Sequence, residues 1–458
     1  MILTHDEETI VARCTPAGSG AIALIRLSGT HAVALTNKMA QLAGKKQLLQ
    51  LPTHTIHYGW VVNTRQERID QVLFLLMRGP QTFTGQDTVE ITCHNNPFLI
   101  EQIIEQAILH GARLAQEGEF TRRSVQHNKI DLIQAEAINE LINAQTQHAL
   151  KKSLGQLDGS FSYYIAQLEK ELIKAMAFCE ASFEFIDEEM EFGGRIAEII
   201  NTALEKITAI KKTFNQQQQV RQGIRIALIG AVNAGKSSLF NALLNKNRAI
   251  VTSIAGTTRD AIEAGLQKNG NYWTLVDTAG LRQTDDIVEQ EGIKKSFEQA
   301  KQADIIVLVF DGAREQSVQE HIVYQTLLQD YAKKIILVRT KADLPATVIA
   351  MLNGHTVLAV SNTTKHNITH LEQEIETKIT LLFAQLESPF LLNARQYNLL
   401  VALEKKLIDL KPMLQKTIHY ELISYHLNDA IAHLAEQTGK SISEASMDAV
   451  FREFCVGK

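Results

Sequence analysis

One stretch of the sequence has the residue types and the spacing of a phosphate-binding loop. Gly230, Gly235, Lys236 and Ser237 satisfy the pattern G-x-x-x-x-G-K-S between an apolar run, IRIALIG, and a helical run, SLFNALL. In such a loop, backbone N–H groups surround a β-phosphate, the lysine neutralises β/γ charge and the serine hydroxyl binds Mg²⁺. The spacing therefore predicts a nucleotide site with Lys236 as a catalytic residue, formed by Asn233, Ala234, Gly235, Lys236, Ser237 and Ser238.

Three later motifs favour GTP as the nucleotide. Asp277 ends the apolar run YWTLV and can hold Mg²⁺ through water, while the N–H of Gly280 can sense a γ-phosphate. A threonine of the segment at 256–260, GTTRD, can complete the magnesium shell. Asp343 can accept hydrogen bonds from both N1 and N2 of guanine, and adenine offers no matching pair of donors. The predicted nucleotide-binding set therefore adds Asp277, Thr278, Ala279, Gly280, Thr340, Lys341, Ala342 and Asp343.

The residue that orients the attacking water is not evident from these motifs. Ras-like domains carry a glutamine after the DTAG segment, whereas this chain has Leu281, which cannot orient water. The downstream candidates are Asp285, Asp286 and Glu289. The alternative is that this acidic run is a solvated switch loop, and the residues alone slightly favour that interpretation.

The composition indicates a multidomain globular protein. At about 150 residues per domain, the 458 residues correspond to about three domains. The 46 Lys and Arg against 51 Asp and Glu give a formal net charge of -5, which argues against a generic nucleic-acid-binding surface. The four cysteines have no CxxC spacing and the apolar runs are too short for a bilayer, so we expect a cytoplasmic protein without a membrane segment.

The periodicity predicts an α+β domain at 1–121, followed by a helical bundle that an α/β domain interrupts. The bundle halves are 122–220 and 385–458, and the inserted domain at 221–384 has the pattern of a parallel sheet covered on both faces. The polar stretch at 214–220 suits a linker. In the first domain we expect one helix after Pro97, closed by Gly111, and strands at 21–29, 53–62, 71–79 and 87–95. The bundle stripes are Ile130, Ile133, Ala137 and Leu141; Ile165, Leu168, Leu172 and Met176; Ile196, Ile199, Leu204 and Ile207; Leu399, Leu403, Leu407 and Leu410; and Leu427, Ile431 and Leu434.

The motifs together resemble one family over essentially the whole chain. The segments GAVNAGKSSLFNALL, AIVTSIAGTTRD, DTAGLR, FTGQDTVEITCH and NKIDLIQAEAI, with the terminal FCVGK, resemble the MnmE (TrmE) family of tRNA modification GTPases. The resemblance implies an N-terminal domain that binds a tetrahydrofolate derivative, such as 5-formyl- or methylene-tetrahydrofolate, and forms a homodimer. It also implies a FAD-dependent partner, MnmG (GidA), in a heterotetramer that adds a (carboxymethyl)aminomethyl group to C5 of the wobble uridine of certain tRNAs.

The resemblance also assigns site residues. It implies a K⁺ site formed by Asn233, Thr252, Ile254 and Thr257, Mg²⁺ ligands at Ser237 and Thr258, and Glu289 as the water-orienting residue, ahead of Asp285 and Asp286. K⁺ at the β/γ-phosphates could take the part of an arginine finger. The folate contacts implied are Arg26, Glu90, Lys129 and Lys458. The nucleotide-binding loop then comprises Thr252, Ser253, Ile254, Ala255, Gly256, Thr257 and Thr258, and the last base-contacting motif is Ser361, Asn362 and Thr363.

Several positions depart from the family pattern. Val232 replaces a proline, a backbone change that we expect to be tolerated. Thr340 replaces the asparagine of the guanine motif, and the segment at 361–363 replaces Ser-Ala-Lys, so we expect weaker guanine contacts. The segment His94-Asn95-Asn96 replaces a His-Gly-Gly-like turn in the folate domain. Cys455 is a candidate nucleophile, and the favoured alternative is either a small buried apolar residue or one whose tail positions Lys458 in the folate site.

Two other functions are also compatible with the sequence. The chain could be a ribosome-assembly or RNA-binding GTPase switch without folate chemistry, or a scaffold with a degenerate G domain. The basic pairs Arg122-Arg123, Lys151-Lys152 and Lys405-Lys406 are candidate tRNA contacts, although such pairs are usually solvated helix faces.

Overall fold

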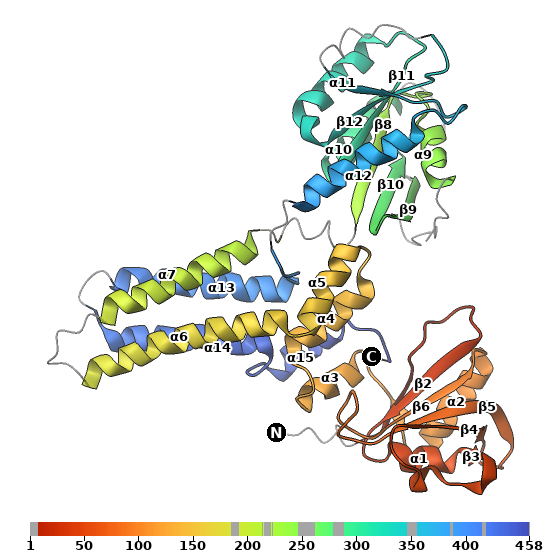
Figure 1. The fold of residues 1–458 in the computed structure, drawn as a ribbon, viewed down its shortest axis with the longest axis vertical. Helices are drawn as coiled ribbons and strands as arrows, with labels where there is room; N and C mark the ends of the chain where they lie inside the picture. The colour runs from red at the N-terminus through yellow and green to blue at the C-terminus, as the bar shows by residue number, and fades with distance from the viewer. Residues whose placement is uncertain are drawn as a thin grey trace. The chain divides into compact units, whose positions relative to one another are not determined.

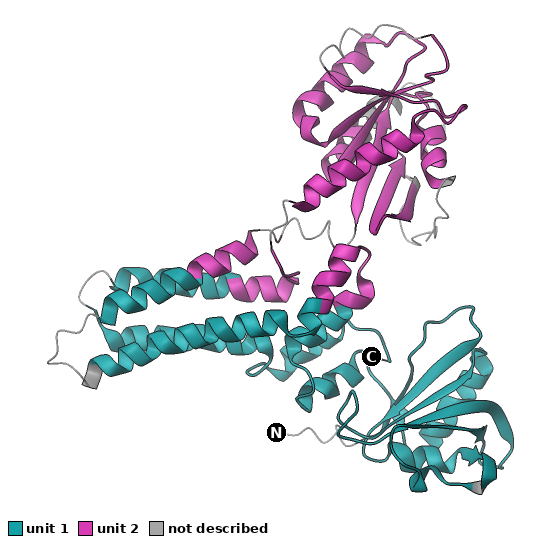
Figure 2. Ribbon diagram, viewed as in Figure 1, with its two compact units in different colours: residues 1–139, 155–203, 401–458 teal, residues 140–154, 204–400 magenta. Residues whose placement is uncertain are grey.

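The chain forms two compact units, each assembled from separate segments (Figure 2). Unit 1 comprises Met1–Asn139, Gly155–Ala203 and Val401–Lys458, and unit 2 comprises Glu140–Leu154 and Leu204–Leu400. The computed structural model describes residues 8–184, 192–212, 214, 221, 223–245, 262–277, 288–345, 355–384, 388–414 and 418–457. The domain boundaries given above stay predictions.

Unit 1 begins with a seven-stranded sheet of order β3-β4-β5-β6-β2-β1-β7 (Figure 1). Neighbouring strands pair antiparallel, except β1 and β7, which are parallel. The four strands expected here are present, and three short ones are additional. The strands are β1 (Ile10–Arg13), β2 (Ile22–Ser28), β3 (Ala40–Leu42), β4 (Thr55–Val62), β5 (Arg68–Met77), β6 (Thr88–His94) and β7 (Arg113–Leu114).

Two helices pack against one face of this sheet. Helix α2 (Pro97–Leu109) starts where predicted, because the Asn96 side chain accepts a hydrogen bond from the N–H of Phe98 and proline tolerates the first helical position. Helix α1 (Ala32–Lys38) was not expected, so the prediction of a single helix is wrong. Both helices share a buried cluster with the inward residues of β2, which include Ala23, Ile25 and Leu27. The expected α+β class of this domain is confirmed.

The opposite face of the sheet carries large apolar side chains that stay exposed. Ile22, Ile56, Tyr58 and Leu73 are between 41% and 64% exposed. Strand residues alternate between faces, so these side chains point away from the cluster beneath α1 and α2. We call this surface the open sheet face.

The two segments predicted to form the bundle are largely helical where the structure describes them. Helices α6 and α14, from the two halves of the chain, lie side by side (Figure 1), as expected for one bundle with an insertion. Four helices (α4, α5, α7 and α13) cross the boundary between the units. The helices are α3 (Glu119–Gln126), α4 (Leu132–Asn143), α5 (Gln147–Leu157), α6 (Ser160–Glu184), α7 (Phe192–Lys211), α13 (Ala394–Leu410), α14 (Tyr420–Thr438) and α15 (Glu444–Phe451), with a 3₁₀ turn η6 (Lys411–Leu414).

The predicted stripes are right in part. Ile165, Leu168 and Leu172 are buried on α6, but the stripe then continues through Ala175 and Cys179, and Met176 is only half-buried. On α7 the buried line runs through Ile196, Ile200, Ala203, Ile207 and Ile210, so Ile199 and Leu204 lie beside it. Small residues such as Ala175 and Ala203 form part of the buried face of each helix. A pattern based on large apolar residues does not include them. Ile130 precedes α4, and Leu399 and Ile431 are half-buried.

Unit 2 contains a six-stranded sheet of order β13-β12-β11-β8-β10-β9. The five predicted strands are parallel, whereas the edge strand β9 is antiparallel to β10, so the expectation of a wholly parallel sheet is wrong at this edge. The segment 215–220 of the predicted linker lies outside the described residues. The strands are β8 (Ile224–Gly230), β9 (Ile262–Lys268), β10 (Asn271–Asp277), β11 (Ile305–Asp311), β12 (Ile335–Thr340) and β13 (Val357–Ala359).

Helices cover both faces of this sheet, as predicted. On one face, Leu239 and Leu243 of α9 (Lys236–Asn245) and Ile375 of α12 (Ile368–Ala384) share a cluster with Ile226 and Leu228 of β8. On the other, Ala300 of α10 (Val288–Gln302) and Leu327 of α11 (Val318–Tyr331) share a cluster with Ala227 and Ile229 of the same strand. The alternate residues of β8 therefore face opposite helix layers, which confirms the inserted α/β domain.

Candidate functional site

The phosphate loop joins the central strand β8 to helix α9. Strand β8 ends at Gly230 and α9 begins at Lys236. Gly235 has a φ of +89°, a conformation that favours glycine, and Asn233 also has a positive φ of 60°. A Cβ at Gly230 would collide with the carbonyl oxygen of Val309 on β11. Glycine at 230 and 235 is therefore required by the local packing and the backbone conformation.

Lys236 is the charged centre of this loop. Its side chain is only 4% exposed, and Nζ donates to the carbonyl oxygens of Gly230 and Ala231, both at 2.7 Å. Burial lowers the pKa of this amine, while the nearby carboxylate of Asp277 opposes the shift. Asp277 is 1% exposed, at the end of β10, where it pairs in register with Leu228. The structure thus brings the lysine and the aspartate of two predicted motifs together.

The base-contacting motifs converge on the same loop. The Thr340 hydroxyl, fully buried at the end of β12, donates to the carbonyl oxygen of Ala234 at 2.6 Å. Asn362 Nδ2 lies 3.5 Å from the carbonyl oxygen of Gly235. The Thr340 side chain is therefore turned toward the phosphate loop.

Lys341 and Asp343 follow Thr340 in the chain. The Ser361 hydroxyl donates to Asp343 Oδ1 at 2.6 Å and lowers the pKa of this exposed carboxyl. Lys341 Nζ forms a 2.6 Å ion pair with the buried carboxylate of Asp311. Ser361, from the altered last motif, therefore orients the carboxylate that the guanine motif depends on. Ala342 is half-buried and Thr363 is exposed.

The other predicted nucleotide contacts are only partly described. Asn233, Ser237 and Ser238 are exposed on the loop and the first turn of α9. Glu289 lies in the first turn of α10, and its side chain is outside the described part of the chain, as are Leu281, Asp285 and Asp286. The remaining predicted contacts lie outside the described residues: Thr252, Ser253, Ile254, Ala255, Gly256, Thr257, Thr258, Thr278, Ala279 and Gly280.

Two of the four predicted folate contacts meet on the open sheet face. Arg26 of β2 and Glu90 of β6 are directly opposite in register, and Arg26 Nη2 forms a 2.7 Å ion pair with Glu90 Oε1. The Arg26 guanidinium also lies over the ring of Phe120, 5.5 Å from its centroid. Lys129 is exposed between α3 and α4, and Lys458 lies outside the described residues.

The C-terminal segment packs against the start of α3. Glu117 and Val456 form a β-bridge, and the N–H of Gly118 donates to the carbonyl oxygen of Cys455 at 3.4 Å. Gly457 passes so close to Arg13 that a Cβ there would meet its carbonyl oxygen. Cys455 itself is exposed, which contradicts the alternative of a small buried residue. Its reactivity and the placing of Lys458 by its tail stay predictions.

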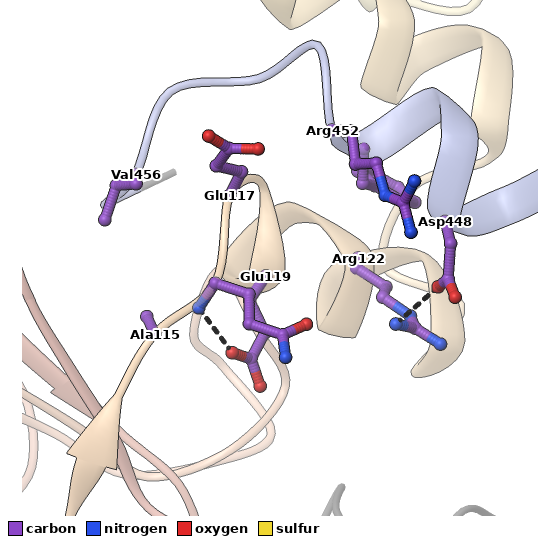
Figure 3. A pocket seen from close by; sticks show the side chains of 9 residues that line it. Ala115, Glu117, Glu119, Arg122, Asp448, Arg452 and Val456 are labelled. Carbon is purple, nitrogen blue, oxygen red and sulfur yellow. Dashed lines mark hydrogen bonds and ion pairs between the residues drawn. The ribbon is translucent and has the colours of Figure 1, made fainter.

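A cavity of about 440 Å³ lies beside this segment (Figure 3). Arg122 Nη1 and Asp448 Oδ1 form a 2.8 Å ion pair at its wall, and Glu119 accepts a hydrogen bond from the N–H of Gln116. The cavity walls carry both signs of charge, and most of these charges are already paired. Its lining comprises Ala115, Gln116, Glu117, Glu119, Arg122, Asp448, Phe451, Arg452 and Val456.

The basic pair Arg122-Arg123 is not a solvated helix face, and only the half-buried Arg122, which pairs with Asp448, stays a candidate tRNA contact. Arg123 is fully buried and donates to Glu119 Oε1 at 3.0 Å and to Gln86 Oε1 at 2.9 Å. Arg113 binds the same glutamate with two hydrogen bonds, of 2.6 and 2.8 Å. Burial opposes ionisation of Glu119, but these bonds prevail and lower its pKa. The Glu119-to-Arg123 spacing of i,i+4 on a helix was the available sequence signal, and it was missed.

The other two basic pairs also have internal partners. Lys152 donates to the carbonyl oxygen of Ser388 at 2.7 Å, and burial lowers its pKa. Lys406 forms an ion pair with Asp429. Lys151 and Lys405 are exposed and remain candidates for external contacts.

Comparison with known proteins decides the family. The model of the MnmE helical domain matches residues 132–455, and that of the GTP-binding protein TrmE N-terminus matches residues 9–129. A tRNA modification GTPase MnmE from Lysinibacillus sphaericus is 36% identical over 98% of this chain and 99% of its own length. The chain belongs to the MnmE (TrmE) family of tRNA modification GTPases. Members from Acetivibrio thermocellus and Geobacillus thermodenitrificans are each 35% identical, over 99% and 98% of this chain and 100% and 99% of their own lengths.

Membership of the MnmE family confirms the resemblance and the enzyme class, a GTPase. Within the described ranges, no helix is long and apolar enough to cross a membrane. The same residues contain no group of three or more His, Cys, Asp or Glu placed to hold a metal ion.

Proposed function

We propose that the chain hydrolyses GTP at the phosphate loop and uses the nucleotide cycle to support a modification of tRNA. The observation that carries this proposal is the convergence of Lys236, Asp277 and the base-contacting residues on one loop, in a chain of the MnmE family. Guanine specificity is assigned to Asp343, whose carboxylate Ser361 orients. Because Thr340 is committed to the loop backbone, Asp343 carries most of the discrimination between guanine and adenine.

The loop residues supply positioning and charge to phosphoryl transfer. Lys236 exchanges its bonds to two backbone carbonyls for bonds to phosphate oxygens, and it is drawn to the charge that develops there. The Ser237 hydroxyl, Asp277 and Thr258 would hold Mg²⁺, and hydroxyl and carboxylate oxygens are the donors that this ion prefers. Mg²⁺ supplies neutralisation of charge on the β/γ-phosphates. Glu289 is proposed to orient the attacking water.

A potassium ion is proposed as a further cofactor. The exposed amide of Asn233, held in a positive-φ conformation at the rim of the loop, supports this assignment, and Thr252, Ile254 and Thr257 would complete the site. K⁺ supplies positive charge at the β/γ-phosphates. Steady-state GTP hydrolysis with Lys236→Ala as the inactive reference tests the enzyme assignment, and absence of turnover in the unaltered chain would favour a degenerate scaffold.

We also propose that the open sheet face binds a tetrahydrofolate derivative. Arg26 and Glu90 support this because they form a partly exposed pair of opposite charges beside an aromatic ring. The carboxylate can accept from an amino-pteridine edge, and cations, with Lys129 and Lys458 included, can bind the glutamate tail. Folate binding to the full chain by calorimetry separates this function from an RNA-binding GTPase switch, which would bind no folate.

The proposed assembly is a homodimer that works with the FAD-dependent protein MnmG on the wobble uridine of tRNA in the cytoplasm. The exposed apolar side chains of the open sheet face support the homodimer, because a second copy would remove them from water. Light scattering of the purified chain tests the dimer, and Tyr58→Glu should weaken it. Nucleoside analysis of tRNA treated with both proteins tests the modification.

A further inference from the structure

A buried tyrosine outside every motif named above holds the first peptide of the phosphate loop. Tyr324 lies on α11 and is 3% exposed. Its hydroxyl accepts a hydrogen bond from the N–H of Ala231 at 2.8 Å and donates to the carbonyl oxygen of Val309, 3.3 Å away. Val309 is opposite Gly230 in the register of β8 and β11. The hydroxyl therefore sits where the phosphate loop leaves the sheet.

The carbonyl side of the same peptide is held by Lys236. The N–H of Ala231 and the carbonyl of Gly230 belong to one peptide unit, and Lys236 Nζ donates to that carbonyl at 2.7 Å. Both polar groups of the peptide are therefore bonded, one from α11 and one from within the loop. Because a peptide is planar, fixing its two ends fixes the direction in which the loop starts.

A second buried hydroxyl holds the other end of the loop. Thr340 donates to the carbonyl oxygen of Ala234 at 2.6 Å and lies 3.1 Å from that of Phe310 on β11. Its methyl group would be 3.4 Å from a Cβ at Gly235, so it also closes the space beside the loop glycine. Tyr324 and Thr340 come from different elements and contact opposite ends of the same four-residue turn.

We propose that Tyr324 and Thr340 are positioning residues that hold the phosphate loop in its nucleotide-binding conformation, Tyr324 at its entry and Thr340 at its exit. A loop fixed before binding loses less conformational freedom when phosphate enters, and this difference appears as affinity. Burial raises the pKa of Tyr324 to about 12, so the hydroxyl keeps its proton and can donate to Val309 while it accepts from Ala231. The inference rests on the proposed nucleotide site at 233–238.

Removal of each hydroxyl separates this role from a purely structural one. Tyr324→Phe keeps the ring and leaves the Ala231 N–H without its partner. We expect the dissociation constants of GDP and GTP to rise together by about tenfold, the effect of one buried hydrogen bond. The KM for GTP should rise with little change in kcat, because the residue does not contact the reacting atoms. Thr340→Val should weaken GDP and GTP binding in the same way. Thr340→Ser, which keeps the hydroxyl, should keep the affinity of the unaltered chain.

The experiment is a fluorescent-GDP titration of the full chain, with thermal unfolding of each variant measured beside it. Tyr331→Phe is the matched control, since Tyr331 is on the same helix and its ring faces Lys334. Unchanged GDP affinity in Tyr324→Phe, or a lower unfolding temperature without a change in affinity, would overturn the proposal. Hydrogen exchange of the amides at 231–236 without nucleotide gives a second readout. Exchange of these amides should be faster in Tyr324→Phe than in the unaltered chain, whether or not nucleotide binds. If the unaltered chain bound no guanine nucleotide, the proposed function would be refuted, and the exchange rates would still test the role of Tyr324.

Discussion

Arg26 and Glu90 face each other across β2 and β6 and form a 2.7 Å ion pair on the open sheet face. Their side chains are 21% and 16% exposed, so the pair is accessible to a ligand and partly desolvated. A folate that bonds to Glu90 must compete with Arg26 or bind both partners at once. The two residues are therefore expected to respond to substitution as a unit.

The first prediction concerns folate affinity. Glu90→Gln removes the charge that accepts from the pteridine edge and should weaken folate binding by about tenfold or more, as expected for a charge-assisted hydrogen bond. Calorimetric titration of the full chain measures this. Glu105→Gln, at an exposed position of α2, is the control and should bind as the unaltered chain does. Equal folate affinities for the two variants would show that Glu90 does not contact folate.

The second prediction concerns proton uptake at Lys236. Burial lowers its pKa below the ordinary 10.5 in the free protein, whereas bound phosphate favours the charged amine. At a pH between the pKa of the lysine in the free protein and its pKa in the complex, the free lysine is partly neutral and the bound lysine is charged. GDP binding should therefore take up protons at alkaline pH, and affinity should fall as pH rises. Calorimetry in buffers of different ionisation enthalpy detects the uptake, which Lys236→Met should abolish.

The third prediction concerns the buried Arg123. Its replacement by methionine leaves the Glu119 carboxylate short of one partner and should cost about 3 kcal/mol, as for other broken buried ion pairs. Urea unfolding measures the loss, and hydrogen exchange in β1 and α3 locates it. Arg65→Met, at an exposed turn, should change stability by no more than about 0.5 kcal/mol. A similar small effect for Arg123→Met would show that the pair is dispensable.

The fourth prediction concerns acid stability. The pKa of Glu119 is lowered from its ordinary 4.5, so its ionised form favours the folded state above that value. This contribution should disappear as pH falls from 4.5 through the folded pKa. Unfolding midpoints measured between pH 6 and about pH 3 should decline less steeply in Glu119→Gln, although that variant is less stable at neutral pH. Parallel pH profiles for the two chains would contradict the assignment.

The fifth prediction concerns the docking of the C-terminal segment. Gly118 has a φ of +62°, and a Cβ there would lie 2.9 Å from both the Phe451 carbonyl oxygen and Phe454 Cβ. Gly118→Ala should therefore loosen the segment and raise the alkylation rate of Cys455. Mass spectrometry after brief iodoacetamide treatment follows this rate. Gly194→Ala, where a Cβ meets nothing within 4 Å, should leave it unchanged. Unchanged labelling in Gly118→Ala would mean that other contacts hold the segment.

The sequence predicts elements well where local pattern and burial coincide. Strands β8, β10, β11 and β12 are near-continuous apolar runs because helices cover both faces of the sheet. The observed ends of these strands lie close to the ends of the apolar runs. Helix α2 carries its own start signals in Asn96 and Pro97. In contrast, β9 contains Gly265 and charged residues, and its place depends on an antiparallel partner that local pattern does not reveal.

The site was predictable at the level of motifs and less so at the level of contacts. Loop spacing located Lys236 and Asp277, which the structure brings together. The turn of Thr340 toward Ala234, the reach of Tyr324 from α11 and the burial of Arg123 all depend on tertiary packing between distant segments. No periodicity in the sequence encodes such contacts.

The most direct test of the proposed GTP hydrolysis is its rate in the purified chain in KCl and in NaCl at equal ionic strength, with Glu289→Ala in parallel. We expect strong stimulation by K⁺, which Asn233→Ala reduces, and a large loss of turnover in Glu289→Ala in either salt. Equal rates in the two salts, with Glu289→Ala as active as the unaltered chain, would contradict the proposed K⁺ site and the assigned water-orienting residue.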